Sequence, residues 1–331
     1  MKHYILTIFL FLMMIRGIDI HAQTPYGDQP LANTYSIVAY DPETGNMGVA
    51  VQSHWFSVGT IVSWGEAGVG VIATQSFVNV SFGPGGLELL KKGLSPQEVV
   101  DRLLSTDEGR EVRQLAVLDK QGRVAVHTGN NCIPDAGHIA GDGYSVQANM
   151  MINDKVWPAM SKAFESAEGA LAERMMAALK AAENAGGDIR GKQSAALLVV
   201  RGEATGNLWE DRLVDIQIAD HPEPLKELER ILKVHRAYGH MNNGDLAIEQ
   251  GDHKLALEEY GKAEKMFPEN LEMKYWHAVS LVNIGMMEDA IPVFHEIFKQ
   301  DNNWKLLTPR IVGVGLLDVD KEELEEILNV K

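Results

Sequence analysis

Residues 34–53 read TYSIVAYDPETGNMGVAVQS, and this stretch decides the fold of the first part of the chain. Two runs rich in β-branched and small apolar residues, Thr34–Tyr40 and Met47–Ser53, flank the turn-rich segment Asp-Pro-Glu-Thr-Gly-Asn. Runs of this composition around such a turn are typical of a β-hairpin. The stretch therefore predicts two neighbouring antiparallel strands.

The following 170 or so residues continue with strands and helices in blocks, by the same kind of pattern. Ser95-Pro96-Gln97-Glu98 is a capping box with proline at the first helical position, which predicts a helix through about Leu104. A long helical stretch is predicted over residues 156–184, ended by the pair Gly186-Gly187. Further strands are predicted at residues 68–76, 115–118, 124–127, 194–200 and 213–218. Hairpins, then helices, then strands again favour a layered α+β fold over a parallel βαβ fold.

Beyond the proline-containing segment at residues 221–224 the chain becomes helical and acidic, and it contains an internal repeat. The repeated positions are Gly251, Ala256, Tyr260, Ala263 and Pro268, followed 34 residues later by Gly285, Ala290, Phe294, Ile297 and Asn302. This period, with small and aromatic residues at these positions, resembles the tetratricopeptide repeat. We therefore predict a small all-α domain over residues 223–331. Two copies are few for a free solenoid, so we expect them to pack on a neighbouring domain or a partner, and a generic helical cap is the alternative.

Composition excludes several classes of protein. The 331 residues carry 46 acidic and 30 basic side chains, a formal charge of −16, which argues against nucleic acid or an anionic membrane surface as the main partner. The single cysteine, Cys132, excludes an intrachain disulfide and a Cys-rich zinc site. No HExxH motif, phosphate loop or GxSxG elbow occurs. Neither a metal nor an organic cofactor is expected.

The first 22 residues have the pattern of a secretory signal peptide. Lys2 and His3 precede an apolar run over residues 4–15, and a small residue, Ala22, stands at the expected cleavage point. The run is shorter than the roughly 20 apolar residues that span a bilayer. We expect a periplasmic or secreted protein without stable membrane insertion; an uncleaved anchor or a buried strand is the alternative. Residues 23–33 form a polar, proline-containing lead peptide.

Thr34 is the candidate nucleophile, because it places a hydroxyl at the first position of the first predicted strand. A threonine hydroxyl becomes reactive when a base lies beside it, and a free α-amine on the same residue can be that base. Such an amine has a pKa of about 8, whereas that of a lysine side chain is about 10.4, so much more of the α-amine is unprotonated at neutral pH. This chemistry requires Thr34 to be the first residue of the working chain. Otherwise Thr34 is simply a β-branched strand residue.

Residues 34–235 resemble the domain of unknown function 1028 family. The segments that carry the resemblance are TYSIVAYDPETGNMGVAVQSHWFSVGTIVSWGEAGVGVIATQSFVNVSFGPGG, RQLAVLD, TGNNC, GYSVQANMM, GKQSAALLVV and DRLVDIQIADH. The resemblance implies the four-layer αββα sandwich of N-terminal-nucleophile hydrolases over residues 34–222, with Thr34 as nucleophile. It also implies a helical extension, matched here by residues 238–305, which is described in relatives as repeat-like or peptidoglycan-binding.

The chain departs from relatives that begin Met-Thr, in which removal of methionine exposes the threonine directly. Cleavage after Ala22 leaves residues 23–33 ahead of Thr34. Exposure of the Thr34 α-amine therefore requires a second cut, between Asn33 and Thr34. This cut would be made either by the chain itself through an N-to-O acyl shift or by another protease.

Supporting residues are expected at strand ends and loops, where hydrogen-bond donors can meet a developing oxyanion. Asn149 and Gln75 are the predicted catalytic partners of Thr34, facing it across the sandwich. For each candidate the alternative is an ordinary turn or sheet-end hydrogen bond. The predicted substrate-binding residues are Ser53, Asn79, Asn130, Asp188, Arg190 and Asp211.

Two functional hypotheses follow from the sequence. In the first, the protein is a secreted amide-bond hydrolase that uses an N-terminal threonine on small peptides, acylated amino acids or cell-wall fragments. In the second, it is a non-catalytic envelope binding or scaffold protein, in which the lead peptide plugs the site and residues 238–305 bind a partner protein or a cell-wall glycan. The mature N-terminus, Thr34 or Gln23, separates the two.

Overall fold

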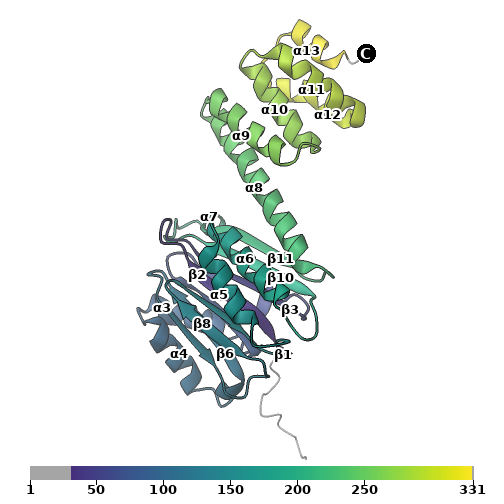
Figure 1. Cartoon of the computed structure of the whole chain (residues 1–331). Coiled ribbons are helices and arrows are strands. Elements are labelled where there is room, and N and C mark those ends of the chain that lie inside the picture. Colours follow the sequence, from purple (N-terminus) through teal and green to yellow (C-terminus); the bar gives the residue numbers. More distant parts are fainter. Residues whose placement is uncertain (1–30, 330–331) are drawn as a thin grey trace, which may run out of the picture. The chain divides into compact units, whose positions relative to one another are not determined.

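A computed structural model describes residues 31–329, and these divide into two compact units between Asp215 and Ile216 (Figure 1). The predicted signal peptide, residues 1–22, and most of the predicted lead peptide lie outside the described residues. No helix in the described part of the chain is long and apolar enough to span a membrane.

The first unit contains a six-stranded sheet built on the predicted hairpin. Strands β2 and β3 pair antiparallel, with Thr34 opposite Ser53 and Tyr40 opposite Met47. The sheet order is β11-β10-β3-β2-β9-β8, and its strands are β2 (Thr34–Tyr40), β3 (Met47–Ser53), β8 (Gly137–Gly141), β9 (Tyr144–Ala148), β10 (Ser194–Val200) and β11 (Arg212–Ile218). The predicted strands at residues 194–200 and 213–218 are confirmed as β10 and β11, which are neighbours in this sheet.

A second antiparallel sheet contains the strands predicted at residues 68–76, 115–118 and 124–127. Its order is β1-β5-β6-β7, and β4 also pairs with β5. Its strands are β1 (Leu31–Ala32), β4 (Ser63–Glu66), β5 (Gly70–Phe77), β6 (Arg113–Asp119) and β7 (Val124–Thr128). Buried side chains from both sheets, among them Val38, Val49, Ala73 and Leu118, form one apolar cluster, so the two sheets face each other.

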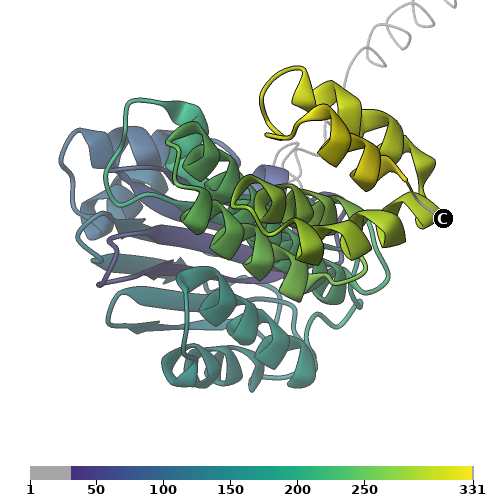
Figure 2. The same cartoon turned by 90° about the horizontal axis from the view of Figure 1, so that it is seen from above.

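Helices pack on the two sheets, and the figures show the arrangement from two directions (Figures 1 and 2). Helices α3 (Phe82–Lys91) and α4 (Pro96–Ser105) contact β5 and β6, whereas α5 (Val156–Ser166) and α6 (Leu171–Asn184) contact β9 and β2. Short helices lie at α2 (Gly59–Val62), η1 (Arg110–Val112) and α7 (Leu208–Asp211). The mixed α+β class predicted from the order of elements is confirmed.

Local chemistry explains where the helices begin and end. The Ser95 hydroxyl accepts from the Glu98 backbone N–H and the Glu98 side chain accepts from the Ser95 backbone, so the predicted capping box is present. The prediction of one helix over residues 156–184 is wrong. The chain leaves the helix at Ala167, and Gly169 adopts φ +95°, a conformation that glycine permits without strain. Two helices of an αα-hairpin result.

After the last residues of β11, the described elements of the second unit are all helices. Its helices are α8 (Pro224–Glu249), α9 (His253–Met266), α10 (Leu271–Asn283), α11 (Met287–Gln300), α12 (Asn302–Val312) and α13 (Lys321–Leu328). Two triplets at equivalent repeat positions are buried: Ala256, Tyr260 and Ala263 on α9, and Ala290, Phe294 and Ile297 on α11. The helical C-terminal region is thus confirmed, whereas its assignment as a tetratricopeptide repeat stays a prediction.

Candidate active site

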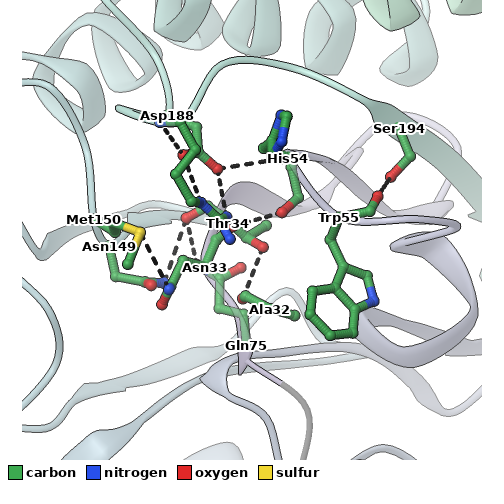
Figure 3. A network of polar contacts seen from close by, with 12 residues as sticks. Ala32, Asn33, Thr34, His54, Trp55, Gln75, Asn149, Met150, Asp188 and Ser194 are labelled. Carbon is green, nitrogen blue, oxygen red and sulfur yellow. Dashed lines mark hydrogen bonds and ion pairs between the residues drawn. The ribbon is translucent and has the colours of Figure 1, made fainter. Parts of the chain in front are cut away.

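Thr34 begins strand β2 and is completely buried (Figure 3). Its hydroxyl Oγ1 donates a hydrogen bond to the carbonyl oxygen of Ala32, at 2.8 Å. Ala32 belongs to β1, which pairs with the end of β5 through Leu31 opposite Phe77 and Ala32 opposite Ser76. The Thr34 hydroxyl therefore points toward the preceding residues and is hydrogen-bonded to Ala32, two positions before it.

The carbonyl oxygen of Asn33 is held by two donors, and this is the acyl oxygen of the bond that precedes Thr34. The Ser53 Oγ donates to it at 2.5 Å, and the Arg190 Nη2 donates at 2.8 Å. One donor is neutral and one carries a full positive charge. Both would stabilise negative charge on this oxygen, as the donors of an oxyanion hole do.

The Arg190 guanidinium is fixed by a bidentate pair with Asp188. Nε donates to Oδ1 at 3.1 Å and Nη2 donates to Oδ2 at 2.7 Å. The Asp188 side chain is fully buried and also accepts from the His54 backbone N–H at 3.2 Å. A buried carboxylate with these partners is satisfied, and the planar fork leaves the guanidinium little freedom. The pair aims one N–H at the Asn33 carbonyl.

Asn149 and Gln75 meet Thr34 at its carbonyl oxygen rather than at its hydroxyl. The Asn149 backbone N–H donates to this oxygen at 3.1 Å and its Nδ2 lies at 3.4 Å. The Gln75 Nε2 donates from the opposite sheet at 3.2 Å. The structure thus brings both predicted partners to Thr34, and these contacts position β2. Gln75 faces Thr34 from the opposite sheet as predicted, whereas Asn149 directly follows β9, the neighbour of β2 in the same sheet, so its predicted place across the sandwich is wrong.

A buried polar network behind Thr34 links the two sheets. The Gln114 Oε1 accepts from Gln75 Nε2 at 2.6 Å and from Asn149 Nδ2 at 2.9 Å. The Ser36 Oγ donates to Gln75 Oε1 at 2.6 Å and accepts from Gln147 Nε2 at 2.6 Å. All five residues are buried. A buried hydrogen-bonded network of this kind fixes the register of the layers around the site.

Sequence reasoning missed Ser36, Gln114 and Gln147. The available signal was a polar residue at an inward position of an otherwise apolar strand, as in RQLAVLD and YSVQA. Such a residue needs a partner when it is buried, which marks it for attention. The partner itself comes from the facing sheet, and the strand pattern does not indicate which residue that is.

Two carboxamide oxygens beside Thr34 have no hydrogen-bond donor among the residues that the structure describes. They are Asn33 Oδ1 and Asn149 Oδ1, and both residues are completely buried. Buried acceptors without a partner are rare and costly. The surroundings of Thr34 therefore have unused capacity to accept hydrogen bonds.

Three other predicted residues make their hydrogen bonds elsewhere. The Asn79 Oδ1 accepts from Ser81 near the start of α3. Asn130 binds Glu111, and Asp211 accepts from the backbone and hydroxyl of Thr205. These are the turn and loop contacts given as the alternative for each residue. Ser53, Asp188 and Arg190 are the predicted substrate-binding residues that gather at the Asn33–Thr34 bond.

Cys132 does not provide an alternative nucleophile in this structure. It is buried, its Sγ donates to the Arg113 carbonyl oxygen at 3.3 Å, and burial raises the pKa of its thiol. A thiol held in the neutral form is a weak nucleophile. Within residues 31–329, no three His, Cys, Asp or Glu side chains gather to hold a metal ion.

Fold and site together define an α+β protein of two facing antiparallel sheets, with a buried threonine whose preceding carbonyl is held by a serine and an arginine. The chain belongs to a family of unknown function, DUF1028, whose match covers residues 34–228. A crystal structure of protein SPO2555 from Silicibacter pomeroyi, of the same family, is 32% identical with a TM-score of 0.56. The similarity covers 61% of this chain and 88% of that one. No curated protein matched the chain.

Proposed function

We propose that the protein is an amide-bond hydrolase of the N-terminal-nucleophile type, produced as a precursor that cleaves its own Asn33–Thr34 bond. The observation that carries the proposal is the pair of donors on the Asn33 carbonyl, Ser53 Oγ and Arg190 Nη2, at the bond preceding a buried threonine hydroxyl. An ordinary strand residue does not require a charged donor on the carbonyl before it. The αββα sandwich of that hydrolase class is the assignment we propose for the first unit.

The cleavage proceeds as an acyl shift followed by hydrolysis. Thr34 Oγ1 attacks the Asn33 carbonyl carbon, and the negative charge on the carbonyl oxygen falls between Ser53 and Arg190. The C–N bond then breaks, the Thr34 nitrogen takes up a proton, and an ester joins Asn33 to Oγ1. Water hydrolyses this ester, which leaves a carboxylate on Asn33 and a free α-amine on Thr34.

The mature site repeats the same chemistry on a substrate amide. The α-amine takes the proton of Oγ1 as the oxygen attacks, and the proton passes to the leaving amine. An acyl-enzyme ester forms and water releases the acid. Asn149 Oδ1, which has no donor among the described residues, is an acceptor available to the new α-ammonium group. Asn149 and Gln75 keep β2 in place through the Thr34 carbonyl.

The family comparison supports this proposal because the match to DUF1028 starts at residue 34, the residue that cleavage would make the N-terminus. Removal of the predicted signal peptide would place this activity in the periplasm or outside the cell. Substrates of that setting are small peptides, acylated amino acids or cell-wall fragments. The helical unit would then serve to bind a partner or cell-wall material.

One experiment separates the hydrolase from the binding protein. The full chain and Thr34→Ala are purified in parallel, incubated, and followed by intact mass. We expect the first to lose its lead peptide at Asn33 and the variant to remain uncut. If the full chain also remains uncut, Leu31–Asn33 stays across the threonine as a plug, and the non-catalytic binding role replaces this proposal.

A further inference from the structure

The residues immediately before Thr34 occupy one edge of strand β5. Leu31 pairs with Phe77 and Ala32 with Ser76, antiparallel. Strand β4 takes an earlier stretch of β5, from Gly70 to Ala73, and β6 runs along the opposite edge. Among the described residues, the strand that pairs with this edge at the end of β5 is therefore β1, which immediately precedes Thr34.

Each residue of that segment sits in a distinct environment. The Ala32 methyl lies in the apolar cluster between the sheets, with Val58 and Val78 among its members, and has no exposed surface. Asn33 is also fully buried, with its Nδ2 3.3 Å from the Met150 sulfur and its carbonyl on Ser53 and Arg190. Leu31 is half-buried. Three consecutive residues thus occupy three distinct positions leading to the nucleophile, and Figure 3 shows Ala32 and Asn33 beside Thr34.

We propose that the substrate is an extended peptide whose acyl side replaces Leu31–Asn33 and adds as a strand to the same edge of β5. This inference rests on the proposed function, and it names the class of molecule that the site takes. The last residue before the scissile bond occupies the Asn33 position, and the one before it must be small, because the Ala32 position is enclosed. Pairing by backbone provides affinity, and the side-chain positions provide selectivity.

Removal of the lead peptide leaves the β5 edge and two hydrogen-bond donors without the partners that such a substrate would supply. The edge of β5 at Ser76 and Phe77 loses its strand partner, while the Phe77 carbonyl oxygen keeps its hydrogen bond from Arg113 Nη1, and a sheet edge without a partner strand binds another strand readily. Arg190 and Ser53 lose the Asn33 carbonyl at the same time. A peptide supplies both a backbone and a carbonyl in the required order, whereas a small amide without a preceding backbone supplies only the carbonyl.

The step on this substrate is balanced within the peptide and water. Thr34 Oγ1 forms an ester with the acyl residue as the C–N bond breaks, the leaving amine takes the proton, and water converts the ester to a carboxylic acid. The product carboxylate then lies beside the Arg190 guanidinium. A peptide acid is therefore a stable ligand with which the site can be tested apart from catalysis.

The test measures binding of N-acetyl-Leu-Ala-Asn, with its free carboxylate, by calorimetry. The first protein is a chain that starts at Thr34 after removal of an initiating methionine, which retains the whole DUF1028 match. We expect it to bind the peptide, and we expect N-acetyl-Leu-Trp-Asn to bind at least about tenfold more weakly because Trp cannot enter the Ala32 position. Arg190→Gln should weaken binding about tenfold or more, since it loses a charged hydrogen bond. Arg201→Gln is the matched control, because the Arg201 Nε donates to the Glu210 carbonyl oxygen and not to the Asn33 position, and its binding should be unchanged.

A second arm keeps the full chain and does not depend on the truncated one folding. The Ala32→Trp full chain cannot seat its own lead segment and should bind N-acetyl-Leu-Ala-Asn, whereas the full chain with Thr34→Ala, which keeps its segment attached, should not. Absence of binding to both the Thr34 chain and the Ala32→Trp chain overturns the inference. Equal binding of the Ala and Trp peptides overturns it as well.

The same samples distinguish failure of this inference from failure of the proposed function. Hydrolysis is measured with N-acetyl-Leu-Ala-Asn-aminomethylcoumarin and with N-acetyl-Asn-aminomethylcoumarin, which lacks the preceding backbone. Peptide binding without hydrolysis of either amide overturns the hydrolase and leaves the peptide site. Equal hydrolysis of both amides supports the hydrolase and overturns the extended-peptide site.

Discussion

The Ser53→Ala substitution tests the self-cleavage of the precursor at the atom where charge develops. It removes the Oγ donor 2.5 Å from the Asn33 carbonyl oxygen and leaves the backbone pairing of residue 53 with Thr34 unchanged. Loss of one oxyanion donor typically slows acyl transfer about 10²- to 10³-fold, or roughly 2.7–4 kcal/mol of barrier. Arg190 keeps its own hydrogen bond to the same oxygen. We therefore expect cleavage between Asn33 and Thr34 to become slow but not to stop.

The assay follows the fraction of cut chain over time by intact mass, starting from freshly purified precursor. Ser161→Ala is the matched control, because Ser161 is a buried serine of α5 whose hydroxyl meets Tyr144 and not the scissile bond. Each substitution removes about one hydrogen bond, which lowers the free energy of unfolding by roughly 0.5–1.5 kcal/mol. The melting temperatures of the two variants should therefore fall by similar amounts. Ser53→Ala cutting as fast as Ser161→Ala would refute the role of Ser53 as an oxyanion donor.

Three further changes test other parts of the account. Asp188→Asn should slow cleavage and lower thermal stability together, because the half-buried Arg190 loses its bidentate carboxylate partner; unchanged stability would contradict the importance of the pair. Because burial raises its pKa, Cys132 should react with iodoacetamide far more slowly in the native protein than in denaturant at pH 8; equal rates would show that the thiol is accessible. In Glu259, burial favours the neutral carboxyl group, but His240, Lys262 and Asn243 together outweigh it and lower the pKa to about 2. The stability contributed by the Glu259 carboxylate is complete above its unfolded pKa of about 4.5 and is lost as pH falls toward 2. Glu259→Gln should therefore melt at lower temperature than the unsubstituted chain at pH 7, and the gap should close between about pH 4.5 and 2; a gap independent of pH would contradict this assignment.

Much of the first unit could be predicted from local patterns because its decisive signals are local. The turn between Tyr40 and Met47 fixes the first hairpin, and Ser95 with Glu98 fixes the start of α4. The break at Gly169 was missed, because the helical periodicity on both sides of it continues and a single glycine is tolerated within many helices. The pairing of sequence-distant strands, such as β10 with β3, depends on the whole sheet.

The candidate site was predictable by residue type and less so by arrangement. Thr34 was predicted from its hydroxyl at the start of a strand, and Asp188 and Arg190 were predicted as charged residues that could bind a substrate. The atom at which these residues converge, the Asn33 carbonyl oxygen, carries no side-chain signal in the sequence. Gln114 was missed for a related reason, because its partners come from across the sheet interface and a strand pattern does not specify them.

The N-terminal sequence of the protein recovered from its native host, read together with its intact mass, tests the central claim most directly. The account predicts a chain that starts at Thr34, with Thr34→Ala retaining the residues before it. A chain that starts at Gln23, with Asn33 and Thr34 still joined, would contradict the hydrolase and leave the lead segment as a permanent plug in a binding protein.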